Sequence, residues 1–135
     1  MNRIMKTLLS HGLRHPARSM SFNRLEKGIL AQVAKGNINV TYHPDYSHLA
    51  IFKYSADCVI ERNWNLFTLM ARGLVLDMKN KDVVATPFMK FFNLNEIEDG
   101  SVSIVEKDYI VTEKVDGSLG IMFRYDGKWM VATAG

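Results

Sequence analysis

The dipeptide Asp126-Gly127 stands between two short runs of strand-forming residues, and it strongly constrains how the C-terminal part of the chain can fold. Asp-Gly favours two-residue turns in which both central residues adopt positive φ, and such turns match the twist of paired strands. The flanking runs, residues 119–125 and 129–134, are rich in β-branched and aromatic residues, which are enriched in strands. We therefore predict an antiparallel hairpin here.

Further strand signals precede this hairpin. The polar stretch 79–82 separates two apolar runs and predicts a second hairpin, although Pro87 confines part of its second strand to an edge or a bulge. Lys107-Asp108 is a candidate turn for a third. The predicted strands cover residues 49–54, 73–78, 83–92, 101–106, 109–114, 119–125 and 129–134.

Helical spacing appears in two places. Apolar residues recur every three or four positions from Phe22 to Val33, with Asn23 and Glu26 as a plausible cap and Gly36-Asn37 as the stop. Residues 64–70 carry a shorter pattern whose aromatics suit a core better than a base-stacking platform. The expected fold class is α+β, an antiparallel β-rich sheet with one or two packing helices.

Composition favours a single domain. A chain of 135 residues with 47% hydrophobic content is long enough for one core but hardly for two. We expect a basic, helical segment over 1–48 and a β-rich part over 49–135. Residues 1–25 hold five cations and no acid, so this segment is a solvated surface, a phosphate-binding arm or an organellar targeting peptide.

Cysteine and histidine usage points away from disulfides and metal centres. Cys58 is the only cysteine, and the four histidines show no ligand spacing. The sequence also lacks an apolar run of the roughly 18 residues that a membrane helix needs, and it lacks a secretory signal. We expect a soluble, intracellular, cytoplasmic protein without a membrane partner, with an organelle not excluded.

Lys114 is the strongest candidate for a nucleophilic side chain in this sequence. It lies in Lys114-Val115-Asp116-Gly117-Ser118, between apolar runs that read as buried strands. Partial desolvation or a neighbouring cation lowers the pKa of such an amine and frees its lone pair for nucleophilic attack. Lysine, aspartate and glycine are also common turn residues, so the four-residue match from Lys114 to Gly117 is weak evidence by itself.

Two upstream motifs add specificity. Arg72-Gly73 opens one predicted strand, and Lys90-Phe91-Phe92-Asn93-Leu94-Asn95-Glu96 follows it. With the Lys-x-Asp-Gly-Ser motif third in order, residues 51–135 resemble the phage-type RNA ligase 1 family of ATP-dependent RNA ligases, which are covalent nucleotidyltransferases. The resemblance implies a partial adenylation domain over 1–135, with ATP and Mg2+ as cofactors and RNA 5′-phosphate and 3′-hydroxyl ends as partners.

The resemblance also implies residue roles. Lys114 is the nucleophile that forms a lysyl-adenylate, from which AMP passes to an RNA 5′-phosphate before the strands are joined. The nucleotide-binding candidates are Tyr54, Arg72, Lys90, Phe92 and Gly117. Asp116 orients Lys114 or a hydrated magnesium, or merely builds the turn. No residue is assigned as a metal ligand.

The chain departs from the family pattern at two points. A basic residue commonly precedes the glycine that aligns with Gly135, whereas Thr133 and Ala134 are uncharged. The family's metal-binding glutamate and paired lysines lie further downstream, so we expect the N-terminal part of a ligase. The alternative is a truncated, non-catalytic remnant that binds nucleotide or RNA. A DNA ligase or capping enzyme is disfavoured by the Lys-Phe-Phe-Asn segment.

Overall fold

The computed structural model describes residues 14–93, 96 and 111–134, and these residues form an α+β arrangement. A four-stranded antiparallel sheet has the order β1-β2-β3-β4, and a separate hairpin pairs β5 with β6. The strands are β1 (Ile38–Tyr42), β2 (Leu49–Tyr54), β3 (Arg72–Asp77), β4 (Asp82–Ala85), β5 (Gly120–Tyr125) and β6 (Lys128–Thr133). The helices are η1 (Pro16–Arg18), α2 (Phe22–Ala34), α3 (Ala56–Ile60) and α4 (Leu66–Met70).

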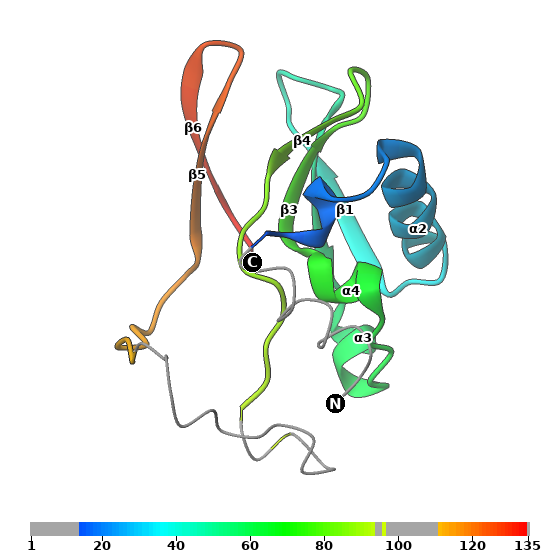
Figure 1. Ribbon diagram of the computed structural model, residues 1–135, viewed down its shortest axis with the longest axis vertical. Helices are drawn as coiled ribbons and strands as arrows, with labels where there is room; N and C mark the ends of the chain where they lie inside the picture. Colours follow the sequence, from blue (N-terminus) through cyan, green and yellow to red (C-terminus); the bar gives the residue numbers. More distant parts are fainter. Residues whose placement is uncertain (1–13, 94–95, 97–110, 135) are drawn as a thin grey trace.

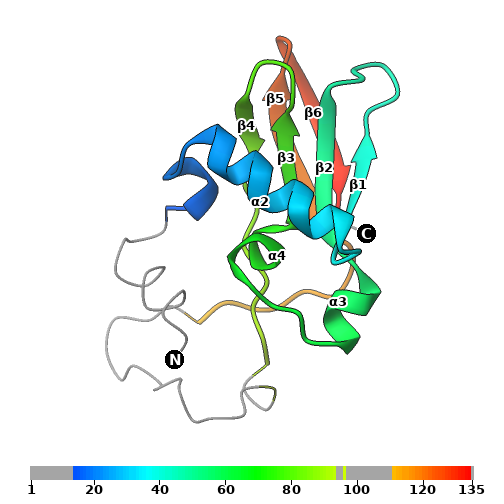
Figure 2. The ribbon, with the colours of Figure 1, turned by 90° about the vertical axis from the view of Figure 1, so that its right-hand side faces the viewer.

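The sheet lies between two covering layers. Helix α2 crosses one face of it, and the β5–β6 hairpin stands over the other face (Figures 1 and 2). Strand alternation sends Phe52, Leu74 and Leu76 toward the helix and Leu49 and Val75 toward the hairpin. The two apolar clusters therefore hold helix, sheet and hairpin together.

Helix α2 confirms the predicted amphipathic helix. Leu25 and Ile29 are fully buried, and Gly36 adopts the positive φ of 78° that commonly follows a helix. The cap differs from the expected one, because the Ser21 hydroxyl accepts from the backbone of Arg24. In the described residues no helix is long and apolar enough to cross a membrane.

The β5–β6 hairpin also confirms its prediction. Asp126 and Gly127 adopt φ of 48° and 70°, and Tyr125 pairs with Lys128 across the turn. Two positive φ values are what a two-residue turn between twisted strands requires. Ile121 and Phe123 face the sheet, while Met122 and Trp129 are 69% exposed.

The Asp77 carboxylate fastens the hairpin to the sheet. It is buried at the end of β3 and accepts hydrogen bonds from the backbone of Lys79 and Asn80 and from the Tyr125 hydroxyl. Burial alone would raise the pKa of Asp77, but the hydrogen bonds from Asn80, Tyr125 and Lys79 outweigh burial and lower the pKa to about 2. Burial and the neighbouring Asp77 raise the pKa of Tyr125 to about 12.

Two strand predictions need correction. The predicted strand 83–92 ends at Ala85, just before Pro87, and residues 86–93 form no regular element. The predicted strand 109–114 is wrong over its described part, 111–114, where Val111 is 81% exposed and no partner strand covers it. The predicted strand 101–106 lies outside the described residues. Strand β1 and helix α3 were not predicted.

Candidate functional site

A β-bulge at Gly73 decides which way Arg72 points. Phe52 lies opposite Leu74 and Lys53 lies opposite Arg72, so Gly73 is an extra residue in β3. Its φ of 87° suits glycine, and a Cβ here would lie 2.3 Å from the Ile121 side chain. Opposed residues share a face of the sheet, so the bulge brings Arg72 onto the hairpin face together with Lys53.

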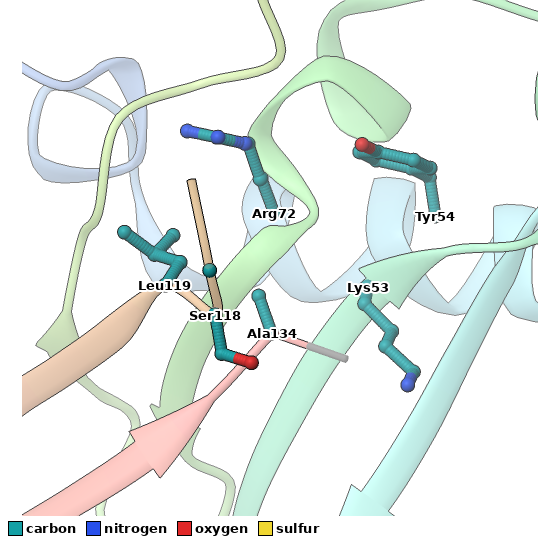
Figure 3. Close-up of a pocket in the computed structure, with 7 residues that line it drawn as sticks. Lys53, Tyr54, Arg72, Ser118, Leu119 and Ala134 are labelled. Atoms are coloured by element: carbon teal, nitrogen blue, oxygen red, sulfur yellow. The ribbon is translucent and has the colours of Figure 1, made fainter. Parts of the chain in front are cut away.

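These two cations line a pocket of about 300 Å³ at the junction of sheet and hairpin. Figure 3 shows the Arg72 guanidinium and the Lys53 amine pointing toward different rims of the pocket, with Ala134 between them. The volume is at the lower end for small-molecule sites. The full lining is Lys53, Tyr54, Arg72, Gly117, Ser118, Leu119 and Ala134.

The pocket lining carries positive charge and no acidic side chain. Arg72 donates a long hydrogen bond (3.4 Å) to the Phe88 carbonyl, and its guanidinium carbon lies 4.9 Å from the Phe91 ring centroid. Like charges directly opposed across two strands are destabilising. An anionic ligand between Lys53 and Arg72 would offset this repulsion.

An aromatic cluster adjoins the pocket through Tyr54. The Tyr54 ring meets the Trp64 ring edge-on at 5.1 Å, and Trp64 meets Phe92 in the same manner at 5.3 Å. The Lys90 ammonium lies 4.8 Å from the Phe92 ring centroid and 5.8 Å from that of Trp64. Cation–π attraction therefore holds Lys90 among these rings. Lys90 and Phe92 do meet, but from an irregular segment rather than from the predicted strand.

Lys114 lies on an exposed segment and not in the pocket lining. Its side chain is 73% exposed, and its amine lies 3.7 Å from the fully exposed carboxylate of Asp116. The expected desolvation of this amine by flanking buried strands is therefore absent, because residues 111–118 are all exposed. Three residues further along, Gly117 has a φ of 137° and does line the pocket.

The structure thus gathers the predicted site residues only in part. Tyr54, Arg72 and Gly117 share the pocket. Lys90 and Phe92 are linked to it indirectly through Trp64. Lys114 and Asp116 lie outside its lining. Sequence reasoning missed Lys53 as a pocket residue. The available signal was a cation within the apolar run 49–54.

Carboxylates are sparse around this site. Among residues 14–93, 96 and 111–134 there is no group of three or more His, Cys, Asp or Glu side chains that could hold a metal ion. The cations of the pocket suit phosphate oxygens, and its tyrosine offers a planar surface to a base.

Comparison with known proteins gives the chemistry a context. A family model described as RNA ligase, of the T4 RNA ligase 1 type, matches residues 70–135. Residues 70–135 are therefore similar to the RNA ligase family. The matched RNA ligase segment contains Arg72, Lys90, Phe92, Lys114 and Gly117, whereas Lys53 and Tyr54 precede it.

A viral relative of the RNA ligase segment supports the same family. A protein of Autographa californica nuclear polyhedrosis virus, named as a bifunctional polynucleotide kinase/RNA ligase, is 33% identical over 72 residues. The match covers 47% of this chain and 10% of the relative. The chain therefore spans about a tenth of the length of that protein.

Proposed function

We propose that the chain is part of the adenylation domain of an ATP-dependent RNA ligase, with Lys114 as the nucleophile. The observation that carries this proposal is the convergence of Arg72, Tyr54 and Gly117 on one cationic pocket, with Lys114 three residues before Gly117 in the chain. Support also comes from the RNA ligase family match over residues 70–135.

In this proposal the pocket binds ATP and orients its α-phosphate toward Lys114. Tyr54 offers an aromatic face to the base, and the Arg72 guanidinium offers several donors to sugar or phosphate oxygens. Lys90 adds charge from the aromatic cluster. The positive φ of Gly117 gives the backbone a close approach to the nucleotide.

The proposed step exchanges one bond for another. Once the Lys114 amine has lost a proton, its nitrogen attacks the α-phosphorus, a P–N bond forms, and the bond to the pyrophosphate oxygen breaks. Asp116, whose carboxylate lies 3.7 Å from the amine, orients it. Magnesium carried by the ATP phosphates offsets part of their charge. The AMP then passes to an RNA 5′-phosphate, and a 3′-hydroxyl displaces it.

Lys114 also has to move. Its exposed side chain lies outside the pocket lining, so nucleotide binding must be coupled to a rearrangement of residues 111–118. Coupling of this kind is common in enzymes in which substrate binding moves a loop and so brings the catalytic residues together.

The test uses ATP labelled at the α-phosphate. Incubation with Mg2+ should leave covalent label on the denatured chain that resists alkali and is released by acid, as expected of a P–N bond. Lys114→Arg should abolish the label, because a guanidinium keeps the charge but cannot serve as the nucleophile. Lys128→Arg, at an exposed hairpin position, is the matched control and should label normally. Label that survives Lys114→Arg would remove Lys114 from the proposal.

A second candidate function is nucleotide or RNA binding without catalysis. It is favoured by the exposure of Lys114, which is 73% for the side chain. ATP binding without any labelled adduct, together with RNA binding that weakens steeply with salt, would support this candidate over the ligase.

A further inference from the structure

Lys53 occupies an unusual position for a lysine. It lies on β2, a central strand of the four-stranded sheet, two residues after Ile51 on the face that the hairpin covers. Leu49 and Ile51, on the same face, pack into the apolar cluster beneath the hairpin. Lys53 follows them on the same face of β2, and its side chain lines the pocket instead of packing into the apolar cluster.

The described part of the chain gives Lys53 no ionic partner. No carboxylate of the described residues lies within 4.0 Å of the Lys53 amine, although the Lys53 side chain is half-buried. Directly across the sheet stands Arg72, a second cation. Partial burial of an unpaired charge and opposition of like charges both cost free energy. An anion in the pocket would relieve both costs.

The neighbour of Lys53 in the pocket sharpens the inference. Ala134 lines the same pocket beside Lys53 (Figure 3). Position 134 is uncharged here, so β6 brings no cation to this rim of the pocket. Among the described residues that line the pocket, Lys53 on β2 is the one that brings a positive charge to this rim.

From this geometry we infer that Lys53 is a phosphate-binding residue of the pocket and that it supplies the positive charge that position 134 lacks. The ligand class is a polyphosphate, with Arg72 at one rim and Lys53 at the other. This inference rests on the proposed function for the identity of the nucleotide, but not for the binding of the phosphate chain.

The experiment compares three probes by calorimetry: ATP, inorganic tripolyphosphate and adenosine. Lys53→Gln should weaken ATP and tripolyphosphate binding by about tenfold or more, the size expected for one charge-assisted hydrogen bond. Adenosine binding should not change. Lys53→Arg should keep most of the affinity because it keeps the charge.

Two further variants make the outcome specific. Lys128→Gln removes one positive charge at the exposed end of the hairpin and should leave all affinities unchanged. In Lys53→Gln/Ala134→Lys, a lysine on β6 should restore at least part of the lost tripolyphosphate affinity. Equal binding of tripolyphosphate by the wild-type chain and Lys53→Gln would overturn the inference.

Failure of the ligase proposal gives a different result. If the chain forms no adenylate but Lys53→Gln still weakens tripolyphosphate binding, the phosphate site stands and the ligase proposal falls. If the adenylate forms while Lys53→Gln and the wild-type chain bind ATP equally well, the ligase proposal stands and Lys53 has no role in phosphate binding.

Discussion

The Tyr125 hydroxyl donates a 2.7 Å hydrogen bond to the Asp77 carboxylate, and this contact joins the last residue of β5 to the last residue of β3. His48 approaches the same hydroxyl, with its Nε2 3.0 Å from the phenolic oxygen. The pocket residues Gly117 and Leu119 precede β5, at the other end of the hairpin. The hairpin is therefore held to the sheet at the end distant from the pocket.

Removal of this hydrogen bond should destabilise the fold. We expect Tyr125→Phe to lower the free energy of unfolding by about 1–3 kcal/mol, because the bond is made to a buried, charged carboxylate. Urea denaturation measures the change. Tyr42→Phe is the control, since Tyr42 is 49% exposed. An equal loss in both variants would contradict a special role for the Tyr125–Asp77 contact.

The Asp77 carboxylate should also make stability depend on acidity. Its folded-state pKa, about 2, lies below the ordinary value of 3.8, so its contribution is complete above about pH 4 and is lost as the pH falls toward 2. The loss should amount to about 2 kcal/mol. Urea midpoints between pH 5 and 2 measure it. Asp77→Asn should be less stable at neutral pH and should decline less steeply over this range.

Gly73 should tolerate substitution poorly for two separable reasons. Gly73→Ala places a Cβ 2.3 Å from Ile121 at a φ of 87°, whereas Gly36→Ala meets nothing within 4 Å at a φ of 78°. We expect about 1 kcal/mol of destabilisation from backbone strain in Gly36→Ala. Gly73→Ala should cost more, by the added overlap with the hairpin. Thermal unfolding measures the loss of stability in both variants. Equal losses would show that the hairpin shifts to make room for the added Cβ at position 73.

Trp64 should report on ligand binding. It contacts Tyr54, a pocket residue, and the Lys90–Phe92 pair, whereas Trp129 is 69% exposed on the hairpin. If ATP binds as proposed, it should change the fluorescence of Trp64. Trp129→Phe should retain the response and Trp64→Phe should lose it. A response that depends on Trp129 would place the nucleotide elsewhere.

Local sequence signals predicted the parts of the fold that local interactions determine. The spacing of Leu25 and Ile29 identified α2, and Asp126-Gly127 identified the β5–β6 hairpin. Strand β1 was missed although Ile38, Val40 and Tyr42 alternate with polar residues. Helix α3 is only five residues long, and its Ser55 cap is a weak signal by itself.

Other features depend on contacts that sequence spacing does not reveal. Val111 and Val115 have the composition of a strand, but no described segment pairs with them, and they remain 81% and 80% exposed. Lys53 and Ala134 are distant in the chain and meet only because the hairpin folds onto the sheet. Family resemblance pointed to Arg72 and Gly117, but it gave no reason to consider Lys53.

The bulge at Gly73 determines which face of the sheet carries the pocket's guanidinium. If β3 paired with β2 in strict alternation, Gly73 would lie opposite Lys53, and Arg72 would point toward the side that α2 covers. Because Gly73 is an extra residue, Arg72 takes the position opposite Lys53 instead. Here one irregularity of backbone pairing, and not only the identity of the side chains, encodes the chemistry of the site.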